Sequence, residues 1–206
     1  QQCINTDEYD NIKSVVNDYL KEGIAHTLDE TRNLSDSGQF EDISLQQGIR
    51  QILYPYEEME VLNPEWEVIL KDIIDSLFEQ MSDEEYNILN EEFGTYMVSR
   101  AYEYRQLLEY LVFRYFAKSI YDYDFLGKCQ MLVTNFFVIR QMDIIRWLDN
   151  HREYSFKDRM DVVHIFSRQV EYSDDNIENL YEDFIFDDIF KTDSLIAILW
   201  IDSENI

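Results

Sequence analysis

Glycine and proline are scarce in this chain, with five glycines and two prolines among 206 residues. A sheet with many tight turns needs more of both, because glycine supplies the positive φ angles and proline the fixed φ angles of those turns. Apolar residues still make up 46% of the sequence, enough to bury a sizeable core. The composition therefore predicts an all-α fold, and the shortage of glycine argues against a glycine-rich phosphate loop.

Apolar residues recur at helical spacing through most of the chain. We expect successive helices at about residues 6–27, 43–55, 64–77, 83–94, 98–120, 125–149, 156–171, 174–184 and 195–201. Residues 28–42 are rich in Ser, Asp and Gly, which is typical of a mobile loop. No repeat of 20–50 residues is visible. The chain is therefore expected to form a single helical domain over residues 1–206, an irregular multi-helix bundle of about seven to nine helices.

Several residues mark helix ends. Asn63-Pro64 combines a capping residue with a first-turn proline, and Ser82 with Glu85 has the spacing of a capping box. Pro55 is expected to end one helix, because it lacks a backbone N–H, and Gly94 is placed to stop another.

Residues 155–184 predict two capped helices joined by a tight corner. Ser155 and Asp158 form a second capping box, and Ser173 caps the following helix. The first helix has an apolar stripe at three-to-four spacing, formed by Met160, Val163, Phe166 and Val170. The second has a stripe formed by Ile177, Leu180, Tyr181 and Phe184.

The first of these helices also has a polar face. His164, Arg168 and Glu171 follow one another at i, i+4 and i+7, so they are expected on one side of the helix with Ser167 beside them. Arg168 and Glu171 are three residues apart, the spacing of an ordinary intrahelical ion pair. A purely structural pair is the simpler interpretation of this face.

Two motifs resemble the flagellin lysine-N-methylase family. The order Ser167-Arg168-x-x-Glu171, followed by Ser173-Asp-Asp-Asn176, is similar to that family's carboxy-terminal region. Residues 107–118 look like its "E-x-Y-L-V-x-x-F-x-K" helix, here with Glu109, Tyr110, Leu111, Val112, Lys118 and, one place off the pattern, Phe116. Together the resemblance covers roughly residues 100–185.

One position departs from that family. After Glu171 the family usually shows His, and this chain has Tyr172. If that His does chemistry, the substitution abolishes activity. If it packs or forms hydrogen bonds, Tyr can replace it.

The resemblance implies a bacterial enzyme that transfers a methyl group from S-adenosylmethionine to a protein lysine. Its partners would be flagellin, or another lysine-rich protein, and an amino-terminal lobe that is missing from this chain. The family carries a cysteine cluster in that lobe, so a metal or iron–sulfur site is expected outside residues 1–206. The chain would be the carboxy-terminal lobe and, by itself, not catalytic.

The same resemblance suggests which residues could do chemistry. Lysine must lose a proton before it can attack a methyl group, since only the neutral amine is nucleophilic. Glu171, Tyr172 and His164 are the candidates for that proton transfer, with Arg168 fixing Glu171 by an ion pair.

Charge defines an alternative function. The chain has 43 acidic and 17 basic residues, a formal charge of −26. Such a surface repels nucleic acid and anionic membranes, and it favours either solubility or a basic partner. The alternative is therefore a non-catalytic acidic helical module that binds a basic protein partner.

The number of cysteines and the positions of the charged residues indicate whether the chain holds a metal or crosses a membrane. Only Cys3 and Cys129 occur, too few for a zinc site or a cluster, so no metal or cofactor is predicted within residues 1–206. Sparse cysteine fits a reducing, cytoplasmic location. Arg140, Asp143 and Arg146 interrupt the longest apolar stretch, which argues against a membrane span.

Overall fold

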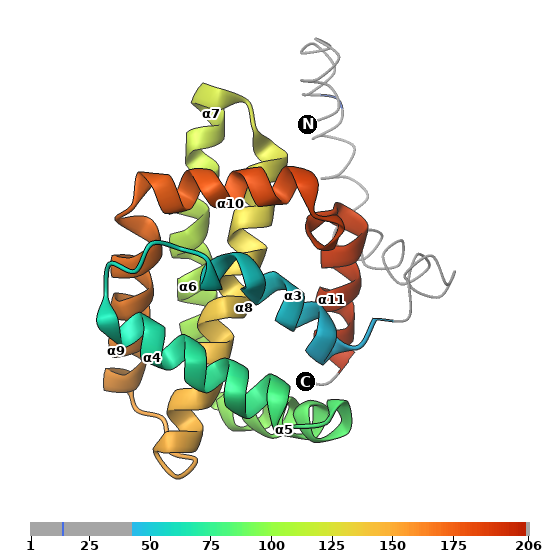
Figure 1. Ribbon diagram of the computed structural model, residues 1–206, viewed down its shortest axis with the longest axis vertical. Helices are drawn as coiled ribbons and strands as arrows, with labels where there is room; N and C mark the ends of the chain where they lie inside the picture. Colours follow the sequence, from blue (N-terminus) through green and yellow to red (C-terminus); the bar gives the residue numbers. More distant parts are fainter. Residues whose placement is uncertain (1–13, 15–42, 205–206) are drawn as a thin grey trace.

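The computed structural model describes Ser14 and residues 43–204, and every regular element among them is helical (Figure 1). This confirms the all-α prediction for the described part of the chain. The helix expected at residues 6–27 lies outside it, apart from Ser14, which is helical, and so does the loop expected at residues 28–42. The α-helices are α3 (Leu45–Glu57), α4 (Pro64–Ile73), α5 (Asp83–Met97), α6 (Ala101–Arg114), α7 (Ser119–Asp122), α8 (Phe125–Asp149), α9 (Phe156–Phe166), α10 (Asp174–Phe186) and α11 (Thr192–Glu204).

Short segments of other helix types interrupt this series. Two are π-helical, η1 (Ile74–Glu79) and η4 (Ser167–Glu171), and three are 3₁₀ turns, η2 (Val98–Arg100), η3 (Phe116–Lys118) and η5 (Asp188–Phe190). The prediction of one long helix over residues 98–120 is therefore wrong, since the segment begins with η2 and the turn η3 separates α6 from α7. The helix expected to continue to residue 171 remains helical, but its last turn widens into η4.

The predicted helix starts are confirmed. The Asn63 side chain accepts a hydrogen bond from the Glu65 backbone N–H at 3.2 Å, and Ser82 and Ser155 both form complete capping boxes. The Ser173 hydroxyl accepts a hydrogen bond from the Asn176 N–H at 3.1 Å. Because these contacts span two or three residues, the local sequence is sufficient to specify them.

The two predicted helix stops are wrong. Helix α3 runs past Pro55 to Glu57, and α5 runs past Gly94 to Met97. Proline removes the hydrogen bond that its nitrogen would donate and crowds the carbonyl four residues before it, but Pro55 is itself buried, and this packing offsets the cost. Gly94 lies between Phe93 and Met97, whose burial stabilises the helical continuation.

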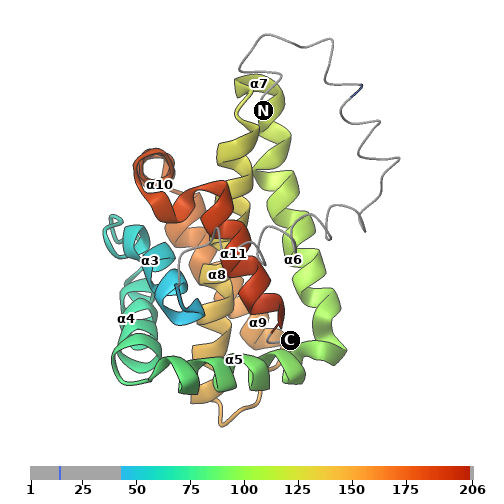
Figure 2. The ribbon, with the colours of Figure 1, turned by 90° about the vertical axis from the view of Figure 1, so that its right-hand side faces the viewer.

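Helix α8 runs through the middle of the bundle (Figures 1 and 2). It packs against α3, α4, α6, α9, α10 and α11. Its buried residues occur on all sides, as expected from the spread of apolar residues over positions 125–149. No helix among the described residues is long and apolar enough to cross a membrane.

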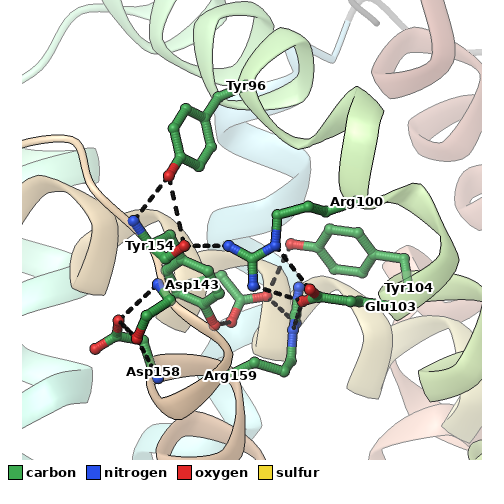
Figure 3. A network of polar contacts seen from close by, with 9 residues as sticks. Tyr96, Arg100, Glu103, Tyr104, Asp143, Tyr154, Asp158 and Arg159 are labelled. Atoms are coloured by element: carbon green, nitrogen blue, oxygen red, sulfur yellow. Dashed lines mark hydrogen bonds and ion pairs between the residues drawn. The ribbon is translucent and has the colours of Figure 1, made fainter.

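A buried charge network joins α8 to α6 and α9 (Figure 3). The Asp143 carboxylate on α8 is fully buried and accepts hydrogen bonds from the hydroxyls of Tyr104, at 2.8 Å, and Tyr154. Arg159, near the start of α9, forms an ion pair with the same carboxylate. Burial raises the pKa of Asp143, while the Arg159 charge and the tyrosine hydroxyls act in the opposite direction.

A second carboxylate extends this network. Glu103 on α6 lies 3.4 Å from the Arg159 Nε, and it accepts hydrogen bonds from Arg100 at 2.7 and 3.0 Å. Arg100 also donates to the backbone carbonyl of Tyr154, in the connection between α8 and α9. The network therefore fixes three helices and one loop relative to one another.

Removing the central carboxylate should lower the stability of the bundle. We expect Asp143→Ala to lower the free energy of unfolding by about 3–5 kcal/mol, because Arg159 then loses its closer carboxylate and the hydroxyls of Tyr104 and Tyr154 lose their acceptor. Urea denaturation followed by circular dichroism measures this change. Asp149→Ala, at an exposed position on the same helix, is the matched control and should change stability by less than about 0.5 kcal/mol. Equal stabilities for both variants would contradict the assigned role of the network.

Candidate functional site

The structure brings the two sequence motifs together at Glu171. Tyr110 lies on α6, and Ser167 and Glu171 lie at the two ends of the π-helical turn η4. Sixty-one residues separate Tyr110 from Glu171 in sequence, yet their side chains form a hydrogen bond of 2.7 Å. The motifs therefore belong to one cluster, which we call the Glu171 cluster: Tyr110, Arg114, Tyr115, Ser167 and Glu171.

Both oxygens of the Glu171 carboxylate are engaged. One accepts hydrogen bonds from Tyr110 at 2.7 Å and from Ser167 at 2.6 Å. The other accepts one from Tyr115 at 3.2 Å and lies 3.8 Å from the Arg114 Nε. Arg114 also donates to the Glu171 backbone carbonyl at 3.1 Å. The carboxylate is thus surrounded by donors, and only 3% of its side chain is exposed.

The two tyrosines of the cluster remain protonated near neutral pH. Burial, and next the hydrogen bond to Glu171, raise the pKa of Tyr110 to about 12. Burial and the Glu171 charge raise the pKa of Tyr115 as well. Each hydroxyl therefore acts as a donor to Glu171, and neither is suited to accept a proton from a substrate.

Arg168 takes no part in the cluster. The predicted Arg168–Glu171 ion pair is wrong, because Arg168 is exposed and the guanidinium next to Glu171 is that of Arg114. The π-helical turn explains the difference, since its wider turn shifts residues that would share a face in a regular α-helix.

The other predicted site residues lie on the surface. His164 is exposed and lines a groove between α4, α8 and α9, and the Tyr172 side chain is 80% exposed. Glu109 is exposed and forms an ion pair with Arg105 at 3.0 Å. The structure therefore brings Tyr110, Ser167 and Glu171 together and leaves the remaining candidates apart from them.

The apolar stripe of α9 also differs from the predicted one. Met160 is 52% exposed and Val163 is half-buried, whereas Phe166 and Val170 are buried as expected. The remaining buried apolar positions are Val162 and Ile165. Helix α9 is thus rotated relative to the expectation, and this rotation places Arg159 towards Asp143.

Asn176 and Gln169 hold the connection between α3 and α4. The Asn176 amide accepts a hydrogen bond from the Glu60 N–H and donates to the Glu60 carbonyl, both at 3.1 Å. Gln169 accepts from the N–H groups of Leu62, at 2.9 Å, and Asn63, at 3.1 Å. Asn176, the last residue of the carboxy-terminal motif, is therefore structural here.

Sequence reasoning missed three residues of this region: Arg114, Tyr115 and Gln169. A signal existed for Gln169, which lies three residues after Phe166 on the buried face, where a polar side chain must find hydrogen-bond partners. Arg114 and Tyr115 stand one turn after Tyr110 and Leu111, but nothing local indicates that they face Glu171.

Gly48 and Gly127 lie within helices, where an added Cβ would meet the Ile198 side chain or the Asp124 carboxylate. Neither glycine opens a cradle for a nucleotide-like ligand. Among residues 43–204, no three His, Cys, Asp or Glu side chains are placed to hold a metal ion.

Comparison with known proteins identifies a family. No curated protein and no solved structure matches the chain. The family model that matches describes the FliB lysine N-methylase C-terminal domain, and the match covers residues 1–198. Since this is nearly the whole chain, the protein belongs to the family of FliB lysine N-methylase C-terminal domains.

Proposed function

We propose that this domain is the non-catalytic helical lobe of an enzyme that methylates lysine residues of flagellin or of another lysine-rich protein. The family supports the lysine N-methylase assignment. The lobe would support an amino-terminal part that carries the chemistry, in a cytoplasmic protein, and would help to present the substrate.

The Glu171 cluster carries this proposal. A general base needs a carboxylate that a substrate proton can reach. Glu171 is buried, its carboxylate accepts hydrogen bonds from three hydroxyl groups, and the Arg114 guanidinium lies 3.8 Å from one of its oxygens. Arg168, Tyr172 and His164 are exposed. The strongest motif of the sequence is thus used to join α6 to the corner between α9 and α10.

We further propose that S-adenosylmethionine binds outside this domain. The scarcity of glycine and the packing at Gly48 and Gly127 both favour this location. A cysteine-bound metal or iron–sulfur site would also lie in the amino-terminal part, since the chain contains only two cysteines.

The charge of the chain favours a second candidate function. A formal charge of −26 on 206 residues attracts basic proteins over a long range. Under this alternative the domain is an acidic helical module that binds a basic partner without any methyl transfer. Methylation by the protein that contains this domain distinguishes the two functions.

Stability measurements separate the roles of Arg168 and Glu171. We expect Glu171→Ala to lower the free energy of unfolding by about 2–4 kcal/mol, because Tyr115 and Arg114 lose their buried acceptor. Arg168→Ala should cost less than about 0.5 kcal/mol, as is usual for an exposed side chain. Urea denaturation of the two variants measures both values. A large loss of stability for Arg168→Ala would contradict this assignment and would support the intrahelical Arg168–Glu171 pair that the sequence suggested.

Activity measurements test the non-catalytic role. In the full-length protein, Arg168→Ala, Tyr172→Phe and Glu171→Gln should each methylate flagellin within about threefold of the wild-type rate, measured at a temperature at which circular dichroism shows them folded. The physical reason is that none of these groups meets the substrate. Loss of a true general base would instead slow transfer by about a hundredfold or more.

The isolated domain provides the complementary control. Residues 1–206 with S-adenosylmethionine and flagellin should transfer no methyl group above background. Transfer by this domain alone, or a rate loss of about a hundredfold in a folded Glu171→Gln variant, would contradict the proposal.

A further inference from the structure

A groove of about 500 Å³ lies where α4, α8 and α9 meet. Each helix contributes one face to it. On α4 and α8 the lining residues recur at i, i+3, i+4 and i+7, starting at Glu65 and Met142, and on α9 they run from Asp161 to Ile165. The three helices pack against one another, so the walls of the groove belong to the core of the fold.

The floor of the groove is apolar. Met142, Ile145 and Ile165 are each exposed by 4% or less, and Ile69 is half-buried beside them. Val68 lies at the opening and is 61% exposed. Such a surface suits an aliphatic chain, because it offers contact without polar groups that would need hydrogen bonds.

Carboxylates surround this apolar floor. Glu65, Asp72 and Asp149 line the groove and form no ion pair with a basic group among residues 43–204. Asp161 lines it too and is paired with Lys157 at 2.6 Å. Besides these four carboxylates, the lining contains one arginine, Arg146. The lining therefore carries more negative than positive charge, and three of its carboxylates form no ion pair among the described residues.

We propose that this groove binds a lysine-bearing segment of the substrate protein. A lysine side chain has four methylene groups that can lie on the apolar floor and an ammonium group that can remain among the carboxylates. The proposal rests on the proposed function for the identity of the substrate, and on charge complementarity and the shape of the groove for the place of binding. The size of the groove allows several side chains of an extended or helical segment to enter it.

Peptide binding tests the site directly. The probe is a fluorescently labelled lysine-rich peptide, with the same peptide acetylated on its lysine Nε atoms as a neutral analogue. Anisotropy at physiological ionic strength, where charges act over about 8 Å, measures the affinity. The wild-type chain should bind the lysine peptide about tenfold more tightly than the acetylated one.

A matched pair of triple variants separates the groove from the general acidity of the chain. Glu65→Gln/Asp72→Asn/Asp149→Asn removes the unpaired carboxylates of the groove and should weaken peptide binding about tenfold. Asp175→Asn/Glu178→Gln/Glu182→Gln makes the same charge change at exposed positions of α10 and should weaken it by less than about twofold. Equal losses in the two triple variants would overturn the proposal.

One further variant tests the apolar floor. Val68→Ser, at an exposed position where the fold tolerates the change, should weaken binding of the lysine peptide about threefold by removing contact with the methylene groups. An unchanged affinity would show that the groove offers charge alone and would overturn the assigned role of the floor.

The binding test and the methylation test can fail separately. If the groove triple variant binds like the wild type while the full-length protein methylates flagellin, the groove proposal is wrong and the proposed function stands. If the groove binds lysine selectively and no methylation occurs, the binding site stands and the domain acts as an acidic binding module.

Discussion

The buried pair of Asp143 and Arg159 is the constraint on which the arrangement of the bundle depends. Helix α8 is buried on nearly all sides, and its apolar residues are spread around it, so hydrophobic packing alone would allow several orientations of α9. A buried carboxylate accepts only the orientation that supplies its donors, because an unpaired buried charge is costly. Arg159 thereby fixes the rotation of α9, and Glu103 and Tyr104 fix α6 against the same point.

A second buried polar contact fixes the neighbouring helices on another side of α8. Arg140 donates to the Asn90 side chain on α5 at 2.9 Å and lies 3.6 Å from Asp202 on α11. Asn90 in turn donates to Asp202 at 2.8 Å. Each helix that surrounds α8 at these places is thus positioned by a specific pair of groups. An irregular bundle without a repeated packing pattern needs such pairs to select one arrangement among similar ones.

The sequence predicts the features that depend on neighbouring residues. It does not predict those that depend on contacts between residues far apart in the chain. The helix starts at Asn63, Ser82, Ser155 and Ser173 were predictable because a cap and its N–H partner lie two or three residues apart. Composition and periodicity likewise predict the all-α class. The break between α6 and α7 and the π-helical turn η4 were not predictable, because no local residue requires either of them.

The Glu171 cluster shows the same limit for a functional interpretation. Spacing alone suggested Arg168 as the partner of Glu171, since intrahelical pairs at this spacing are common. The actual partner, Arg114, is 57 residues away in sequence and comes near only because α6 packs on η4. A motif with the residue types of a catalytic site therefore forms a structural tertiary contact. Residue types alone do not distinguish a catalytic motif from a structural one.

Helix α9 connects these features. Arg159 fixes its first turn against Asp143, and the Glu171 cluster fixes the turn that follows its last residue. Asp161, His164 and Ile165 lie between these two anchors and form one wall of the acidic groove. Because both ends of the helix are held by buried charges, this wall needs little rearrangement to receive a ligand, and less entropy is lost on binding. The buried charged groups at the two ends of α9, which take no part in chemistry, thus hold one wall of the groove in place.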